Sequence, residues 1–154
     1  MISYEITSVS PSLLLSESSI GTGGLCGSAF LNYAFEDHCR RRLGAEIYDR
    51  LKPKTRHMAL KYWDEYVKRN FKEEEPEEEE EISVPLPGVA DDEEKRIEGG
   101  FLMMRREEVK SIFEPVVSQV VKLVDEQVEG IRRKGGKVAV SSLLLHPSYT
   151  RRGA

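Results

Sequence analysis

The fold of this chain is decided by residues 109–131, which read VKSIFEPVVSQVVKLVDEQVEGI. Apolar residues recur there in steps of three and four, the spacing of an amphipathic helix. Pro115 has no amide hydrogen to donate and disturbs the turn before it. The sequence therefore predicts a short helical turn, followed by a longer helix that begins near Glu114 and ends before Gly135. The apolar positions are Val109, Ile112, Phe113, Val116, Val117, Val120, Val121, Val124, Val128 and Ile131.

Two β-rich segments lie towards the ends of the chain. Residues 2–20 are mostly β-branched, aromatic or hydroxyl-bearing, and Ser10-Pro11-Ser12 stands at their centre, which is typical of two strands joined by a turn. Residues 137–145 are rich in valine and leucine, the composition of a buried strand. We predict that both segments belong to one small sheet, against which the 109–131 helix packs.

A glycine-rich loop and two helices follow the hairpin. Residues 21–28, GTGGLCGS, open a helix that ends near Gly44, a residue type common just after helix ends. The basic run 40–42 before that glycine suits the negative end of a helix dipole. A second helix is predicted at about residues 55–71, with Trp63 buried. Its apolar face is broad, and the sequence leaves open whether the buried stripe contains Met58, Tyr62 and Tyr66 or also Leu60, Trp63 and Val67.

An acidic tract and two short strands complete the middle of the chain. Eight of the nine residues from 73 to 81 are glutamates. They repel one another and bury no apolar surface, so the tract is predicted to be a solvated loop or the frayed end of the preceding helix. Residues 82–86 and 96–103 have the composition and turn signals of short strands. The order of these elements predicts an α/β protein.

The net charge of -4 is unevenly distributed along the chain. Without the tract at 73–81, 19 acidic and 23 basic residues remain, and no basic stripe with interleaved aromatic residues is visible. Nucleic-acid binding is therefore not expected. Apolar runs such as 13–15 and 143–145 are far shorter than the roughly 20 residues that span a bilayer, so membrane binding is not expected either. The sequence shows no secretion signal, which favours a cytoplasmic protein.

The sequence indicates no metal site and no catalytic residue. Cys26 and Cys39 lie 13 residues apart without a Cys-x-x-Cys pair, so free cysteines are favoured over a metal site with His38 or His57. No serine stands in a nucleophile-elbow pattern. The carboxylates are too numerous for one pair to stand out as acid and base.

Three short motifs follow one another along the chain. Leu25-Cys26-Gly27-Ser28-Ala29-Phe30 comes after the hairpin, Glu65-Tyr66-Val67-Lys68-Arg69 lies on the second helix, and Pro115-Val116 lies in the last helix. In this order they resemble motifs of the heat-shock 70 kDa chaperone family, especially of its divergent fungal members. That family has a Leu-Gly-Gly-Glu-Asp-Phe loop, then a Glu-x-x-Lys-Arg helix, then a helix with a Pro-Val step. The resemblance covers roughly residues 2–145.

This resemblance implies a partial actin-like ATPase domain with a ribonuclease H-like fold, made of the subdomains of its second half. Residues 2–44 and 105–145 would form the core sheet and helices. Residues 45–104 would form a helical insertion lobe that carries the acidic loop 73–81, and residues 146–154 would be an unstructured tail.

The resemblance also implies a nucleotide site. Gly27 and Ser28 stand where the family approaches the nucleotide, and Glu65, Lys68 and Arg69 stand where it encloses the adenosine. The implied ligand is ATP or ADP, with Mg²⁺ bound only together with the missing half of the domain. Taken without the family, the glycines are also typical of tight turns, and the three charged residues are also typical of a solvated helix face.

Two departures from the family pattern bear on activity. An Asp-x-Gly-Gly-Gly-Thr phosphate loop is expected just before Ile2 and is not in the sequence. A Val-Gly-Gly loop is expected after Leu145, where His146-Pro147 stands instead. The resemblance therefore implies a partial ATP-binding module of a chaperone, without ATPase activity of its own. The alternative is a non-catalytic helical fragment that binds another protein.

Overall fold

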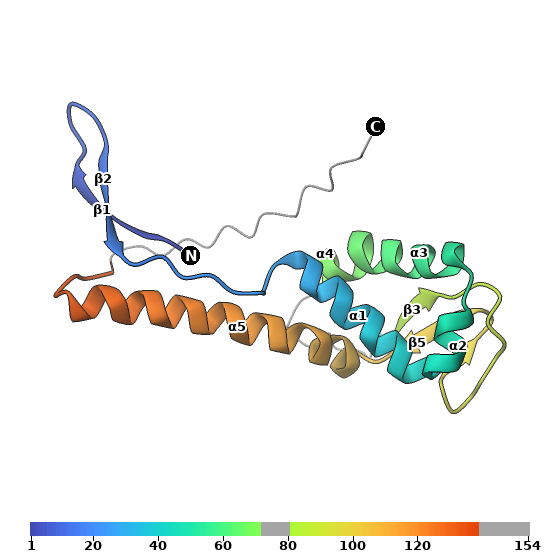
Figure 1. The fold of residues 1–154 in the computed structure, drawn as a ribbon. Coiled ribbons are helices and arrows are strands. Elements are labelled where there is room, and N and C mark those ends of the chain that lie inside the picture. The colour runs from blue at the N-terminus through green and yellow to red at the C-terminus, as the bar shows by residue number, and fades with distance from the viewer. Residues whose placement is uncertain (72–80, 139–154) are drawn as a thin grey trace. The chain divides into compact units, whose positions relative to one another are not determined.

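A computed structural model of the chain describes residues 1–71 and 81–138 (Figure 1). It is a mixed α/β structure in which small sheets accompany longer helices, as the sequence predicts. The chain divides into two compact units: unit 1 contains residues 1–28 and 116–154, and unit 2 contains residues 29–115. None of the described helices has the length and apolar composition that crossing a membrane requires.

Unit 1 begins with the predicted hairpin, which is confirmed. β1 (Ser3–Ser8) pairs antiparallel with β2 (Leu14–Ser19), and Ile6 stands opposite Leu15. The third strand predicted for this sheet, at 137–145, lies outside the described residues except for its first two positions. Those two positions are not part of a strand.

The long helix α5 (Arg106–Arg133) is continuous, so the predicted break near Pro115 is wrong. The proline removes one backbone hydrogen bond. The helix persists because side chains on both sides of the proline are packed: Val109 and Ile112 are buried in unit 2, and Gln127 is buried in unit 1. Tertiary packing overrides the local preference, and the proline marks the boundary between the units instead.

Polar contacts hold the hairpin of unit 1 on α5. The side-chain nitrogen of Gln127 donates to the carbonyl of Ile20 at 2.7 Å and to the hydroxyl of Thr22 at 3.2 Å. The side-chain oxygen of Gln127 accepts from the hydroxyl of Ser3 at 2.8 Å. Among the described residues of this unit, Ser19 and Gln127 are buried, and no large apolar side chain is buried. A buried amide with three partners fixes the position of the hairpin.

Unit 2 combines helices with a small sheet. Its first helix, α1 (Ser28–Leu43), ends where predicted, because Gly44 has a φ of 85°, a left-handed conformation that glycine adopts without strain. The next helical segments are α2 (Ala45–Arg50), α3 (Pro53–Tyr62), the π-helical turn η1 (Trp63–Val67) and α4 (Lys68–Asn70). The last three follow one another without a break and form the predicted second helix, residues 53–70.

The sheet of unit 2 has the order β3-β5-β4, with antiparallel neighbours. The strand β3 (Ile82–Pro85) confirms the predicted strand at 82–86. The single strand predicted at 96–103 is wrong, because a turn at Gly99-Gly100, both with positive φ, divides it into β4 (Ile97–Glu98) and β5 (Phe101–Met104). Most of the acidic tract lies outside the described residues. Its last member, Glu81, forms an ion pair with Arg96.

The apolar core lies in unit 2 and settles which face of the 53–70 helix is buried. That face is formed by Thr55, Ala59, Trp63 and Val67, each four residues after the last. Burial of Trp63 is thus confirmed. The stripe with Met58 and Tyr66 is not the buried one, because both side chains are exposed. The buried apolar residues of the core are Phe35, Cys39, Leu43, Ala59, Trp63, Val67, Val84, Leu86, Ile97, Leu102, Met104, Val109 and Ile112.

The boundaries of the units differ from the division implied by the family resemblance. That division grouped residues 29–44 with the hairpin and set 45–104 apart as a lobe. In the structure α1 belongs to unit 2, because Phe35, Cys39 and Leu43 are buried in the same core as Trp63. Helical periodicity shows that a face is buried but not which element covers it.

Candidate functional site

The predicted nucleotide-site residues fall into two sets. Gly27 and Ser28 belong to unit 1, at the point where α1 begins. Glu65, Lys68 and Arg69 belong to unit 2, on the helix of residues 53–70. The local geometry of each set is therefore described separately.

The helix that carries the second set contains a π-helical turn at Trp63–Val67. Glu65 is the central residue of this turn, and Lys68 and Arg69 follow it directly in α4. A π turn is wider than an α turn, which helps to keep Val67 on the same buried face as Trp63. Single π turns are rare and are concentrated at functional sites. The turn contains the first three residues of the Glu-x-x-Lys-Arg motif, and Lys68 and Arg69 follow it.

Among the described residues, two partners hold Lys68 in place. Its side chain is only 9% exposed, and its ammonium donates to a carboxylate oxygen of Asp64 at 2.6 Å and to the amide oxygen of Asn32 at 2.9 Å. Asp64 lies one turn earlier on the same helix, whereas Asn32 lies on α1. Charge-assisted hydrogen bonds of this kind fix a side chain in one position. Lys68 thus joins the 53–70 helix to α1.

Glu65 and Arg69 are exposed on the same helix, four residues apart. Glu65 lies 3.9 Å from the ammonium of Lys61, and both side chains are about half exposed, at 45% and 59%. An exposed pair at this distance contributes little to stability and is easily replaced by another partner. The two residues are therefore accessible to a ligand, in contrast to the ammonium of Lys68.

Sequence reasoning missed two kinds of neighbour at this site. Tyr62 and Tyr66 stack with their ring centroids 5.2 Å apart, and Tyr66 is 56% exposed. The sequence shows that Tyr62 and Tyr66 are four residues apart, but this spacing is also typical of a buried helix face. Asp64 and Asn32 were missed as partners of Lys68. The four-residue spacing of Asp64 is a signal for an ion pair, but no local pattern links Asn32 to a lysine 36 positions away.

Two glycines of the loop in unit 1 differ in the space available for a side chain. A side-chain carbon at Gly24 would approach Leu123 of α5 to 3.0 Å, so a larger residue at this position would require Leu123 to shift. A side-chain carbon at Gly27 would meet no described atom within 4 Å. Packing within the described part of the chain therefore does not require glycine at position 27.

A separate cluster of charged groups surrounds Glu108 near the start of α5. Its carboxylate forms an ion pair with Arg42, lies 3.7 Å from Arg96 and 3.8 Å from the imidazole of His38, and accepts the backbone N–H of Arg105 at 2.8 Å. These contacts link α1, the turn before β4 and the start of α5 within unit 2. Among residues 1–71 and 81–138, no three His, Cys, Asp or Glu side chains are grouped as a metal ion would require. The ion pairs of Glu108 with Arg42 and Arg96 crosslink these parts of unit 2.

Comparison with protein-family models, curated proteins and solved structures finds no match to this chain. The family resemblance of the sequence motifs therefore stays a prediction. The function proposed below is argued from this resemblance together with the geometry of the residues.

Proposed function

We propose that this chain is part of an actin-like nucleotide-binding domain of the heat-shock 70 kDa type, and that its 53–70 helix binds the adenosine part of ATP or ADP. The observation that carries the proposal is the π turn Trp63–Val67, which overlaps the first three residues of the motif Glu65-Tyr66-Val67-Lys68-Arg69. The mixed α/β architecture is compatible with this assignment.

The exposed residues of the motif suit the two ends of a nucleoside. The carboxylate of Glu65 is an acceptor for ribose hydroxyl groups. The planar guanidinium of Arg69 stacks on flat ring systems such as adenine. Lys68 contributes by position, because its bonds to Asp64 and Asn32 hold the helix against α1. Gly27 and Ser28 remain proposed nucleotide contacts from the glycine loop.

We expect no ATP hydrolysis by this chain on its own. Phosphoryl transfer needs a phosphate cradle, a metal ion and a positioned water that act together. The motifs of this sequence correspond to the adenosine wall alone, and Mg²⁺ binding is assigned to the remainder of the domain. With stacking and a few hydrogen bonds as the attraction, the affinity for ATP is expected to be about millimolar, or roughly -4 kcal/mol.

Calorimetric titration of the chain with ATP, ADP and adenosine tests this function, together with a phosphate-release assay. Arg69→Ala and Lys68→Ala should each weaken binding several-fold, whereas Arg133→Ala, which removes an exposed arginine near the end of α5, should not. Circular dichroism establishes that each variant is folded. Micromolar binding that is unaffected by Lys68→Ala, or phosphate release above buffer level, would contradict the proposal.

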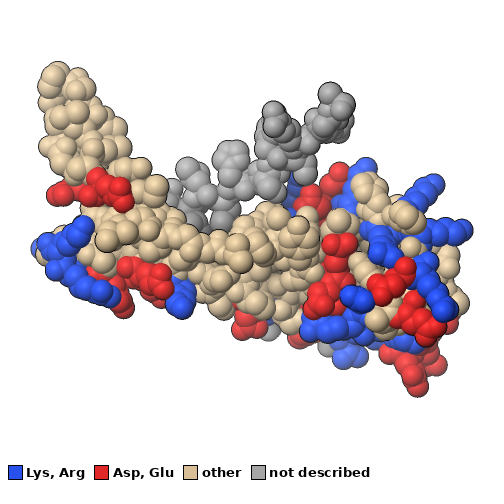
Figure 2. Space-filling view, in the orientation of Figure 1, with Lys and Arg blue, Asp and Glu red and all other residues tan. Residues whose placement is uncertain are grey.

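A second candidate, a protein-interaction fragment, is favoured by the surface of the hairpin in unit 1. A two-stranded hairpin is marginal by itself, and clustered exposed apolar side chains mark interaction sites. The hairpin is mostly without charge in Figure 2, and residues 1–28 contain two charged residues, Glu5 and Glu17. Its large apolar side chains are at least half exposed: Ile2, Tyr4, Ile6, Val9, Leu13, Leu14, Leu15 and Ile20.

Size-exclusion chromatography discriminates this second candidate from the first. A chain that binds no nucleotide, but whose elution volume changes when Ile6→Lys and Leu15→Lys are introduced together, is an interaction fragment. A chain that binds adenosine and elutes identically with and without these changes is not acting through the hairpin.

A further inference from the structure

A stacked pair of tyrosines lies on the 53–70 helix, beside the residues proposed to bind adenosine. The rings of Tyr62 and Tyr66 have their centroids 5.2 Å apart and their planes 26° apart. Tyr62 is partly buried and packs against the core of unit 2, whereas Tyr66 is 56% exposed. Tyr62 therefore covers one face of the Tyr66 ring, and the large exposed fraction leaves the opposite face open to solvent. A ring held in this way is a preformed surface for another flat ring.

The other stacked rings of unit 2 are covered. Phe35 and Trp63 stack inside the core, where both are buried. Phe71 is partly buried and lies under the guanidinium of Arg106, which is 4.9 Å from the ring centroid. Of the stacked rings in the described part of this unit, Tyr66 is the one that is more than half exposed.

Helix geometry places Tyr66 next to the exposed residues of the motif. Residues three and four positions apart are neighbours on a helix surface. Arg69 is the third residue after Tyr66 and the fourth after Glu65, and all three are exposed. The buried face of the helix, which contains Trp63 and Val67, is turned to the core instead. An aromatic ring, a planar cation and a carboxylate therefore share one exposed surface.

We propose that the adenine base of the nucleotide stacks on the open face of Tyr66. This inference rests on the proposed function and deepens it, because it assigns the base to a residue that the family motif leaves unspecified. The guanidinium of Arg69 lies beside the same base, and the carboxylate of Glu65 accepts from the ribose hydroxyl groups. Stacking on an aromatic side chain requires no phosphate, so adenosine and ATP should bind with similar affinity.

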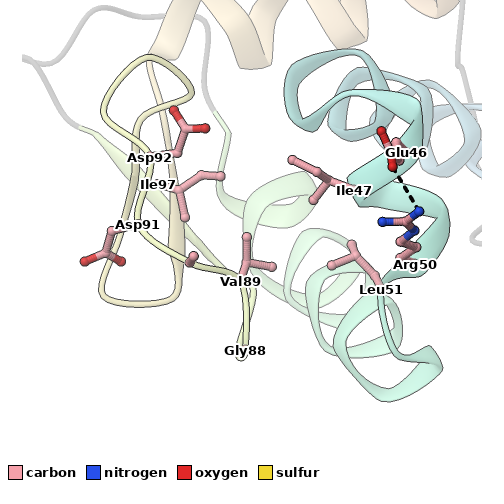
Figure 3. A pocket seen from close by; sticks show the side chains of 10 residues that line it. Glu46, Ile47, Arg50, Leu51, Gly88, Val89, Asp91, Asp92 and Ile97 are labelled. Atoms are coloured by element: carbon pink, nitrogen blue, oxygen red, sulfur yellow. Dashed lines mark ion pairs between the residues drawn. The ribbon is translucent and has the colours of Figure 1, made fainter.

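The groove beside α2 selects no base. It has a volume of about 530 Å³ and lies between α2 and the segment that joins β3 to β4, with Ile47 opposite Val89 on its apolar floor (Figure 3). The side chains of Glu46 and Asp91 are turned away from it in Figure 3. Each carboxylate at its edge already has a partner within the chain: Glu46 pairs with Arg50, Asp92 pairs with Lys95, and Asp91 accepts the backbone N–H of Gly99.

Proton nuclear magnetic resonance of adenosine, titrated with the full chain, tests the inference. The ring current of a stacked tyrosine should shift the adenine H2 and H8 resonances upfield. Tyr66→Phe keeps the ring and should keep both the shift and the affinity. Tyr66→Leu should lose the shift and bind adenosine about fivefold more weakly, or worse. Tyr4→Leu, the matched control, removes a hairpin tyrosine that is 57% exposed and should change neither.

The outcomes separate this inference from the proposed function. If adenosine binds and Arg69→Ala weakens it, but Tyr66→Leu keeps the wild-type affinity and shift, the base lies elsewhere and the stacking proposal alone is refuted. If the wild-type chain binds no adenosine, the proposed nucleotide site is refuted as well. The upfield shift is measured on the wild-type chain, so it tests the stacking even if Tyr66→Leu disturbs the fold.

Discussion

The indole of Trp63 lies flat on the ring of Phe35, with centroids 4.6 Å apart and ring planes 6° apart. Both side chains are buried, and they come from η1 and α1 respectively. Phe113 of α5 packs against the same indole, with a centroid distance of 5.5 Å. Trp63 is therefore the residue through which three helical segments of unit 2 share one core.

Truncation of this tryptophan should be severely destabilising. Trp63→Ala leaves a cavity among Phe35 and Phe113, and large-to-small changes of this kind cost about 3–5 kcal/mol. Tyr66→Ala, three residues further along the same helix but exposed, should cost less than about 1 kcal/mol. Urea denaturation followed by far-ultraviolet circular dichroism measures both free energies of unfolding. Equal losses in the two variants would show that the stacked pair is not central to the core.

The stability of the protein should depend on the protonation of His38. Burial lowers the pKa of His38, and Arg42 adds to this effect, while the carboxylate of Glu108 opposes it. The unfolded chain, with a histidine pKa of about 6.5, therefore binds this proton more tightly than the folded chain. The contribution of neutral His38 is complete above about pH 6.5 and is lost as the pH falls from there through the folded pKa.

Urea midpoints across the range from about pH 7.5 to about pH 5.5 check this dependence. The wild-type midpoint should decrease towards acid more steeply than that of His38→Gln, which has no titrating group at this position. His57→Gln, which changes an exposed histidine on α3, should keep the wild-type slope. Parallel curves for wild type and His38→Gln would contradict the assignment.

The two cysteines should differ sharply in reactivity. Burial raises the pKa of the Cys39 thiol to about 12, and this residue is 2% exposed. The thiolate is the reactive species, so Cys39 should be inert near neutral pH. Titration with an aromatic disulfide reagent should detect one thiol in the native chain, Cys26, and two in denaturant. A native Cys26→Ser variant that still reacts rapidly would show that Cys39 is reachable.

In unit 1, the effect of Gly130→Ala on stability should depend on whether residue 19 is serine or alanine. A side-chain carbon at Gly130 would clash with the hydroxyl of Ser19. Alanine is a better helix former than glycine by up to about 1 kcal/mol, but the Ser19 hydroxyl must rotate away from the added carbon, which offsets part of that gain. Gly130→Ala should therefore stabilise the wild type less than it stabilises a Ser19→Ala background. Thermal denaturation of all four chains measures this coupling. Additive effects would refute the contact.

Local features of this protein follow from its sequence. The hairpin at β1 and β2, the end of α1 at Gly44, the strands β3 and β5 and the burial of Trp63 all rest on turn residues or on apolar spacing within one element. The sequence motif Glu65-Tyr66-Val67-Lys68-Arg69 also predicts a candidate site. Such signals are contained within a few neighbouring residues, so no knowledge of the rest of the fold is needed to read them.

Tertiary structure alone decided the remaining features. It carried α5 through Pro115, placed α1 in unit 2, and gave Lys68 its partner Asn32, 36 positions away. It also brought Ile47 opposite Val89 to form the groove. Each of these outcomes depends on which distant side chains fill the space beside a residue, and the free energy of that packing exceeds the local preferences that a sequence pattern expresses.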